Sequence, residues 1–212
     1  MKQVINIEDW NRKEHFNFFL NYDEPFWGIV SNVECTKGYN FCKENNISFF
    51  LHYFYHSLKA VNSIKEFRYR IENNLLVEYE TIHASQTIEK EDKTFAFGLF
   101  PDFDNFDDFV RYSQQEIAEI KKTKGLGLER VDNPLRLDVI HFSVVKWLSF
   151  TGLTHARNFK FQDSIPKITF GKLFKEQDKL FLPVSINAHH SLMDGYHASL
   201  FFNLFENLIN EK

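Results

Sequence analysis

The chain has 212 residues, 43% of them hydrophobic and 25% charged, which is typical of a globular protein with one sizeable core. A net charge of −4 argues against a surface that follows nucleic-acid phosphates. No apolar run is long enough for a membrane span, and the first residues lack a signal-peptide core. Cys35 and Cys42 are too few for a disulfide framework and too isolated for a zinc site, so we expect a cytoplasmic protein with reduced thiols.

Aromatic residues are abundant, with 25 Phe and 8 Tyr against only 8 Gly and 5 Pro. Such side chains fill the layer between a sheet and its helices, and they also line apolar ligand pockets.

The first part of the chain predicts helices around one strand. In chain order these are a helix over 10–20 capped by Asp9, a strand over 27–35, a short polar helix from Thr36, and a helix over 48–64 capped by Ser48. Residues 67–80 then predict a hairpin that turns at Asn73 and Asn74.

The rest of the chain predicts four strands and two helices. These are a strand over 93–100, an amphipathic helix over 102–125 stopped by Gly125, strands over 137–145, 166–174 and 179–188, and a closing helix over 196–210. No repeat, low-complexity tract or linker interrupts this order, so we expect one domain over 1–212. Strands and helices do not alternate strictly, which favours an α/β sandwich with a mixed or antiparallel sheet.

The segment NAHHSLMDGYH places histidines in a loop between a buried strand and a helix. A histidine held in one orientation, such as His190, can take a proton from a hydroxyl near neutral pH, and Gly195 would allow a sharp bend behind it. The plain alternative is that His189, His190 and His197 are core or surface histidines beside an ordinary turn. A metal site is a further alternative, although no distant ligand cluster matches it.

This segment, following LPVSINA, resembles the active-site segment of chloramphenicol acetyltransferases, whose signature is His-His-x-x-x-Asp-Gly. Acyltransferase cores of 2-oxo acid dehydrogenase complexes and peptide-synthetase condensation domains share that signature. The stretches DWNRKEHFNFF, EFRYRIENNLLVEYE, TFAF and FSVVKWLSFT also resemble the family in the right order, and PKITFGKLFKEQDKLFLPVSINAHH matches it without a gap. The similarity covers nearly the whole chain, and the length fits.

The resemblance implies an α/β fold: a two-layer sandwich of a mixed, largely antiparallel sheet with helices. It also implies acetyl-CoA as co-substrate, no metal, and a homotrimer with active sites at subunit interfaces. His190 would be the general base, and the alkoxide that it generates would attack the thioester directly. His189 is expected to pack, and Asp194 is expected to pair with Arg12.

Further roles follow from the resemblance alone. Ser143 would hydrogen-bond the oxyanion, Thr169 would hold a water near the transition state, and Lys172 would contact CoA. Each has a plain reading as an ordinary strand residue or an exposed lysine. The acceptor pocket would include Phe18, Phe19 and Phe95.

The sequence departs from the family at the acceptor pocket. TGLTHARNF places His155 and Arg157 where the family has apolar residues, and Asp23, Glu24 and Pro25 replace an apolar stretch. We therefore expect weak acetylation of chloramphenicol and preference for another, more polar or anionic, alcohol. Asp23 and Glu24 could instead neutralise Arg157 across the interface, which would leave the drug acceptable.

Two other readings stay open. One is a trimeric small-molecule-binding homologue without turnover, and the other is a subunit that trans-acylates lipoyl groups. Release of free CoA thiol and activity with dihydrolipoamide distinguish these readings from an O-acetyltransferase.

Overall fold

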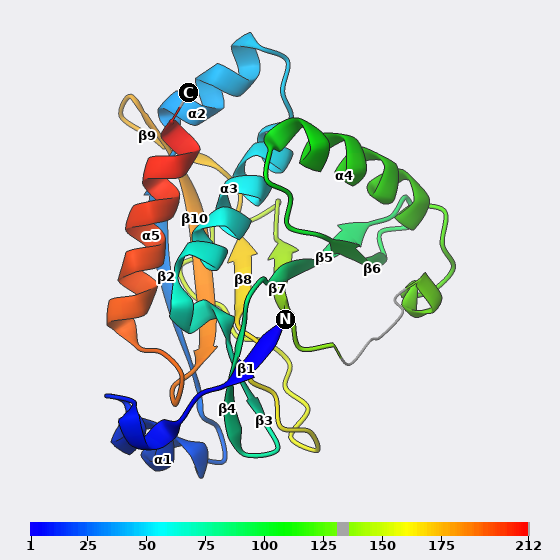
Figure 1. Cartoon of the computed structure of the whole chain (residues 1–212). Coiled ribbons are helices and arrows are strands. Elements are labelled where there is room, and N and C mark those ends of the chain that lie inside the picture. Colours follow the sequence, from blue (N-terminus) through cyan, green and yellow to red (C-terminus); the bar gives the residue numbers. More distant parts are fainter. Residues whose placement is uncertain (131–135, 212) are drawn as a thin grey trace.

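A computed structural model describes residues 1–130 and 136–211 of the chain. Its main sheet has the strand order β2-β10-β8-β7-β5-β6, with β9 paired to β10 (Figure 1). The strands of this sheet are β2 (Phe26–Glu34), β5 (His83–Glu89), β6 (Phe95–Phe100), β7 (Val139–Val144), β8 (Lys167–Phe170), β9 (Phe174–Glu176) and β10 (Lys179–His189). Strand β7 runs parallel to β5 and β8, and the other neighbours are antiparallel. The expectation of a mixed, largely antiparallel sheet is confirmed.

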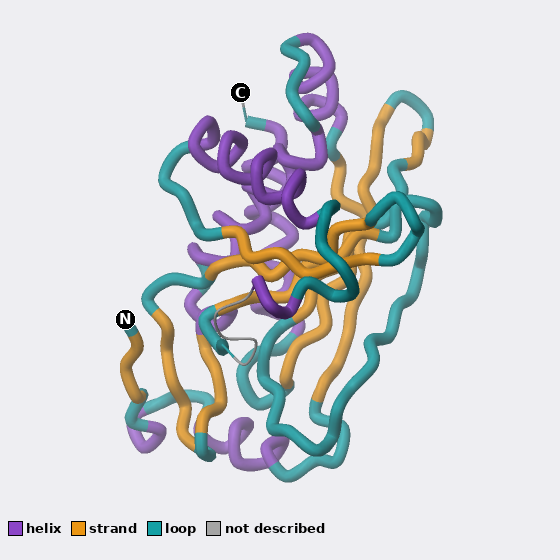
Figure 2. The backbone as a smooth tube through the Cα atoms, turned by 90° about the vertical axis from the view of Figure 1, so that its right-hand side faces the viewer, coloured by secondary structure: helices purple, strands orange, loops and turns teal. Residues whose placement is uncertain are grey.

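Helices cover one face of this sheet, and long loops lie on the other side (Figure 2). The covering helices are α3 (Phe49–Ser63), α4 (Phe106–Ile120) and α5 (Gly195–Asn210), and α2 (Thr36–Glu44) packs against α3 and α5. Ser48 caps α3 as predicted, its side chain accepting from the N–H of Leu51. The two-layer sandwich is therefore confirmed. No helix among the described residues is long and apolar enough to cross a membrane.

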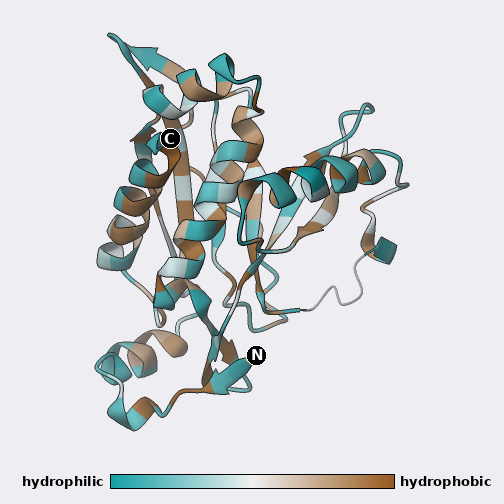
Figure 3. Cartoon of the chain, turned by 45° about the horizontal axis from the view of Figure 1, so that its top comes forward, coloured by the Kyte–Doolittle hydropathy of each residue, from teal (hydrophilic) through white to brown (hydrophobic). Residues whose placement is uncertain are grey.

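The core lies between the helices and the sheet. Alternate residues of β10, namely Val184, Ile186 and Ala188, are buried in it, whereas Asn187 between them lines a cavity on the uncovered face. The helices show apolar sides and polar sides, which Figure 3 colours brown and teal. We call the uncovered side of the sheet the open face.

A small second sheet lies beside the N-terminal helix α1 (Lys13–Leu20). Its strands are β1 (Lys2–Val4), β3 (Tyr69–Glu72) and β4 (Leu75–Tyr79), in the order β1-β4-β3. The predicted hairpin is confirmed: Asn73 and Asn74 adopt φ values of 52° and 62°, which asparagine tolerates in a tight turn. Phe16 and Leu192 join the small apolar cluster that covers this sheet.

Arg70 ties the hairpin to the main sheet. Its side chain is fully buried and donates hydrogen bonds to the backbone carbonyls of Phe67, Tyr69, Leu137 and Val139. The last two carbonyls lie at the start of β7, so one guanidinium holds β3 against that end of the sheet.

Several predicted boundaries were wrong. Helix α1 begins at Lys13, because the preceding turn forms a separate 3₁₀ helix, Ile7–Asp9, which Asn6 caps. Asp9 therefore does not cap α1. Helix α4 begins at Phe106, where Asn105 caps it, and ends at Ile120, before the predicted stop at Gly125. The remaining 3₁₀ helices are Lys65–Arg68 and Leu128–Arg130.

The strand prediction missed β1, β5 and β9. Strand β5 alternates between buried and half-buried residues, but its buried side chains are Ala84, Gln86 and Ile88, a weak apolar signal. The predicted strand over 166–174 is shorter in the structure: β8 ends at Phe170, the chain turns away at Gly171, and the next N–H bonds the Leu148 carbonyl. Gly195 begins α5 without positive φ, so no special bend needs glycine there.

We predict that Arg70→Met lowers the free energy of unfolding by at least ~2 kcal/mol, because buried carbonyls lose their donor. Arg111→Met is the matched control, since that side chain is 69% exposed on α4, and its change should stay within ~0.5 kcal/mol. Urea denaturation of both variants measures the difference. Equal stability of the two would show that Arg70 does not hold the hairpin.

Candidate active site

The ring of His190 is held between two aromatic side chains immediately after β10. It stacks on Phe19 with a centroid distance of 3.9 Å and an interplanar angle of 11°, and the Trp27 ring lies 5.6 Å away. The His190 N–H donates to the Pro25 carbonyl at 2.8 Å. Its Nδ1 is buried and has no hydrogen-bond partner among the described residues. Packing and backbone contacts therefore fix the orientation of this imidazole.

An ion pair between Arg12 and Asp194 braces the loop that carries His190. Arg12 lies directly before α1, and its Nη1 pairs with Asp194 Oδ2 while its Nη2 donates to the His190 carbonyl at 3.4 Å. Burial opposes ionisation of Asp194, but the hydrogen bond and charge of Arg12 outweigh it and hold the carboxyl's pKa below its usual value. The structure thus brings together the two residues that the sequence predicted to pair.

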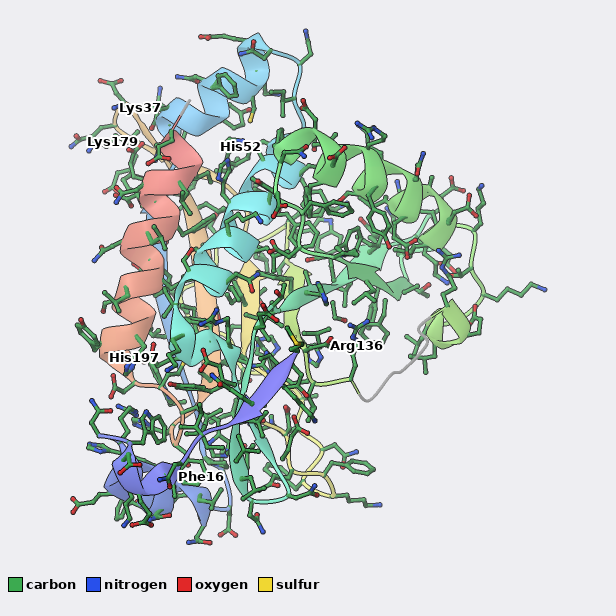
Figure 4. All side chains as sticks on the ribbon, in the orientation of Figure 1. Phe16, Lys37, His52, Arg136, Lys179 and His197 are labelled. Carbon is green, nitrogen blue, oxygen red and sulfur yellow. The ribbon has the colours of Figure 1, made fainter. Side chains whose placement is uncertain are left out.

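Asp194 also caps the N-terminus of α5. The N–H of Tyr196 donates to its Oδ1 at 3.1 Å, and the Asp194 N–H donates to His197 Nδ1 at the same distance. His197 is buried at the start of the helix, where Figure 4 labels it. The third histidine of the motif therefore completes a cap.

His189 is buried and packs edge-on against Phe26 at 5.5 Å. Its Nδ1 accepts the N–H of Ser191 at 3.2 Å. Burial, with a smaller effect of the Arg157 charge, lowers the pKa of His189 to about 4. The ring is therefore neutral at pH 7 and fits a packing role.

Ser143 and Thr169 form a hydroxyl pair on the open face. They are direct neighbours on the parallel strands β7 and β8, and their oxygens lie 2.7 Å apart. His155 approaches from the following loop, with Nε2 3.4 Å from Thr169 Oγ1. Burial is the main cause that lowers the pKa of His155, and the charge of Lys167 adds to it.

Two cavities lie on the open face and share His155 and Lys167 in their walls. The larger, of about 490 Å³, lies between β2, the end of β10 and the loop over 151–157. The smaller, of about 310 Å³, lies over β5, β6 and β7 and includes Ser143 and Phe95. A hollow with both polar and apolar walls therefore extends along the sheet beside the Ser143–Thr169 pair.

Arg157 lines the larger cavity but is already paired within its own chain. Its Nη1 lies 3.1 Å from Glu24 Oε1, its Nε lies 3.8 Å from Asp163 Oδ2, and its guanidinium carbon lies 3.4 Å from the Phe26 ring centroid. The sequence had suggested that acidic residues could neutralise Arg157 across a subunit interface. In the structure Glu24 of the same chain is in contact with it.

The other predicted residues lie apart from one another. Phe18 is 61% exposed on α1 and packs edge-on against Phe19 at 5.0 Å. Phe95 is half-exposed on β6, 5.6 Å from Phe97. Lys172 follows β8, and its backbone carbonyl accepts from Ser149 Oγ at 2.7 Å. Its side chain is exposed.

The predicted catalytic residues form two separate groups. Among the described residues, no hydrogen bond, ion pair or ring contact joins His190 to Ser143 or Thr169. The same part of the chain holds no group of three histidine, cysteine or acidic side chains that could bind a metal ion.

Sequence reasoning missed several polar residues of the open face. His141 and Lys167 line its cavities, and Asp163 accepts from Lys167 Nζ at 2.6 Å. The sequence signal for such residues is a polar residue inside an apolar strand, at a position that alternates with core residues. VIHFSV and KITF both show this pattern. Trp27, whose Nε1 donates to the Met193 carbonyl at 3.0 Å, was also missed as a neighbour of His190.

Comparison with known proteins identifies the family. The family model for chloramphenicol acetyltransferase matches residues 2–206. A chloramphenicol acetyltransferase of Clostridium butyricum is 30% identical over 207 residues, covering 97% of this chain and 93% of that protein. One of Bacillus pumilus is 30% identical, with coverages of 95% and 91%. The chain therefore belongs to the chloramphenicol acetyltransferase family and is an acyltransferase, and the resemblance noted in the sequence is confirmed.

Solved structures show the same fold. A chloramphenicol acetyltransferase superposes with a TM-score of 0.89 at 34% identity, covering 99% of this chain and 100% of that one. The cubic core of a pyruvate dehydrogenase multienzyme complex gives a TM-score of 0.68 at 12% identity, covering 99% of this chain and 90% of that one. The second likeness shows the fold alone.

We predict that Arg12 and Asp194 are energetically coupled. Asp194→Asn keeps an oxygen for the cap but leaves a buried guanidinium without its counter-charge, and Arg12→Met removes the guanidinium. Each should lower the free energy of unfolding by ~1–3 kcal/mol, and the double variant should be less than additive by at least ~1 kcal/mol.

The exposed ion pair between Lys13 and Glu8 is the control, because such pairs couple by less than ~1 kcal/mol. Denaturant unfolding of both double-mutant cycles gives the two coupling energies. Additive effects of the Arg12 and Asp194 variants would contradict the bracing role.

Proposed function

We propose that this protein is an acetyl-CoA-dependent O-acetyltransferase in which His190 is the general base. The imidazole removes the proton of an acceptor hydroxyl, and the alkoxide attacks the thioester carbonyl to give a tetrahedral oxyanion. Collapse of the oxyanion expels the CoA thiolate, which takes the proton from His190. The observation that carries this proposal is the His190 ring, fixed by Phe19 and by the Arg12–Asp194 brace at a strand end.

Ser143 and Thr169 are proposed to serve the oxyanion. The Ser143 hydroxyl would donate to it, and one such donor contributes roughly 10²- to 10³-fold in rate. Thr169, 2.7 Å from Ser143, would orient that hydroxyl and hold a water near the transition state. We assign Lys172, exposed beyond β8, to the binding of CoA.

Each complete site is proposed to combine two chains of a homotrimer, with His190 from one chain and the open face from its neighbour. The separation of the two residue groups within one chain supports this arrangement. Exposed aromatic residues on the loops of the open side support it too, because large exposed apolar side chains favour association. Their exposed fractions are 60% for Trp147, 69% for Phe159 and 66% for Phe161.

The proposed acceptor is an alcohol other than chloramphenicol, and we place the reaction in the cytoplasm. His155 and Arg157 stand in the cavity where the sequence departs from the family. Glu24 neutralises Arg157, so its charge does not by itself disfavour chloramphenicol; instead the guanidinium covers the Phe26 ring, on which an aromatic acceptor would stack. Chloramphenicol should therefore be a weak substrate.

His190→Ala should reduce CoA-thiol release by ~10²- to 10⁴-fold while the melting temperature stays near that of the wild type. Tyr196→Phe, on an exposed ring next to the same helix start, is the control and should keep full turnover. A variant His190→Ala that kept a tenth of wild-type turnover would rule out this base. Wild-type binding of an acceptor without any thiol release would favour a non-catalytic binder, and efficient use of dihydrolipoamide would favour a trans-acylase.

Mixing variants tests the shared site. His190→Ala and Ser143→Ala trimers are each impaired, but random exchange of equal amounts should restore about a quarter of the sites, because each intact half comes from the other variant. Thiol release before and after exchange through mild denaturant measures this recovery. If both residues of a site came from one chain, no activity would return.

A further inference from the structure

The larger cavity of the open face combines hydrogen-bonding groups with apolar side chains. Glu24, His155, Arg157, Lys167 and Asn187 line it, and so do Phe26, Ile29, Val30 and Leu153. Its volume of about 490 Å³ lies in the range that holds small-molecule ligands. An acceptor bound there would meet several polar groups as well as apolar surface.

The fixed charges around this cavity cancel. Arg157 pairs with Glu24 at 3.1 Å, and Lys167 pairs with Asp163 at 2.6 Å. Asp163 also lies 3.8 Å from Arg157 Nε, so two cations and two carboxylates form one neutral network. A charged acceptor would lose its hydration there without gaining a free counter-charge, which is costly.

The histidines of the open face add hydrogen-bonding capacity without charge. Burial and the nearby Lys167 lower the pKa of His141 to about 4, and the same causes lower the pKa of His155. A neutral imidazole offers one donor and one acceptor, which matches a hydroxyl group. His155 lines both cavities and stands beside Thr169, so its contacts lie close to the reacting group.

Positively charged side chains lie close to the phenylalanine ring in the wall of the larger cavity. The Arg157 guanidinium lies 3.4 Å from the Phe26 ring centroid, and Lys167 Nζ lies 4.7 Å from the same centroid. Phe26 is the one aromatic residue in the wall of this cavity among the described residues. An acceptor with an aromatic group would therefore have to displace a paired arginine before it could stack.

Asn187 offers a side-chain amide that the described residues do not use. This amide makes no hydrogen bond with any of them, and it lies across Gly28, where a Cβ atom would stand 2.2 Å from its Nδ2. Glycine at 28 thus leaves room for this side chain at the cavity wall. A ligand hydroxyl can satisfy the amide, whereas an apolar group would leave it unpaired.

We infer that the acceptor is an uncharged molecule with several hydroxyl groups, such as a sugar or another polyol, and that Asn187 and the Arg157–Glu24 pair determine this specificity. The inference rests on the proposed acetyl transfer and names its substrate class. One hydroxyl accepts the acetyl group, while the others hydrogen-bond to the neutral polar walls.

Skeleton-matched acceptors test the charge requirement. Glucose, glucosamine and glucose 6-phosphate serve as neutral, cationic and anionic probes, with maltose as a larger polyol and chloramphenicol as an aromatic one. We expect kcat/KM from CoA-thiol release to be highest for maltose or glucose, at least ~10-fold above either charged sugar and above chloramphenicol. If a charged sugar were the best acceptor and its acetylation required His190, the inference would be wrong and the proposed acetyl transfer would stand. If chloramphenicol were the best acceptor, the inference and the proposed choice of another alcohol would both be wrong, whereas His190-dependent acetyl transfer would still stand.

Two variants test the residues named. Asn187→Leu should lower kcat/KM for the best neutral sugar at least ~10-fold with little change for chloramphenicol. Glu24→Gln gives the network a net positive charge, so it should raise the glucose 6-phosphate to glucose ratio of kcat/KM several-fold. Glu176→Gln, on an exposed carboxylate of β9, is the matched control and should leave that ratio unchanged. If Asn187→Leu did not lower kcat/KM for the neutral sugar and Glu24→Gln did not change the ratio, neither residue would determine the specificity.

Binding separates failure of the inference from failure of the catalytic proposal. In His190→Ala, which retains the cavity, maltose should raise the melting temperature more than glucose 6-phosphate or chloramphenicol does. If maltose stabilised this variant selectively but the wild type transferred no acetyl group to it, the proposed reaction would be wrong and the proposed ligand class would stand. Stabilisation by the charged sugar or by chloramphenicol alone would defeat the ligand class.

Discussion

The ion pair between Arg12 and Asp194 is the contact on which the geometry around His190 depends. It joins the residue before α1 to the residue that caps α5, and the same guanidinium reaches the His190 carbonyl. One carboxylate therefore serves both a helix end and the loop that carries His190. A buried ion pair adds little net stability, but loss of one partner leaves an unpaired charge, and that asymmetry makes the loop conformation specific.

The two faces of the main sheet carry different parts of the structure. The covered face supplies the apolar core, while the open face carries the hydroxyl pair Ser143–Thr169 and the polar cavities. His190 lies at the end of β10, against Phe19 of α1, without contact to that pair. In the proposed mechanism these are two half-sites, which association of copies would bring together.

This chain combines the family's His-His-x-x-x-Asp-Gly signature with a charge-paired arginine in the cavity proposed for the acceptor. Arg157 would disfavour an apolar ligand if its charge were free, but Glu24 and Asp163 neutralise it. The charged groups of the cavity wall therefore cancel. In the proposed function such a wall would select by the number and placement of hydrogen bonds, whereas a free arginine would select anions.

The sequence by itself determined the family through its motifs, and the order of its apolar patterns indicated an α/β sandwich, because both are local signals. The pairing of Arg12 with Asp194 followed from the resemblance to the family. It also placed the hairpin turn at Asn73 and Asn74, residues that tolerate positive φ. It missed β5, whose buried positions carry small or polar side chains, and the late start of α1.

Only the tertiary structure decided how the acceptor side is charged. The sequence raised neutralisation of Arg157 by Asp23 and Glu24 across an interface as one alternative, but Glu24 makes this contact within its own chain, 133 positions away. The network with Asp163 and Lys167 forms because the loop after β7 folds back over the open face. Long-range pairing of this kind depends on the path of the backbone in space, which local patterns do not encode.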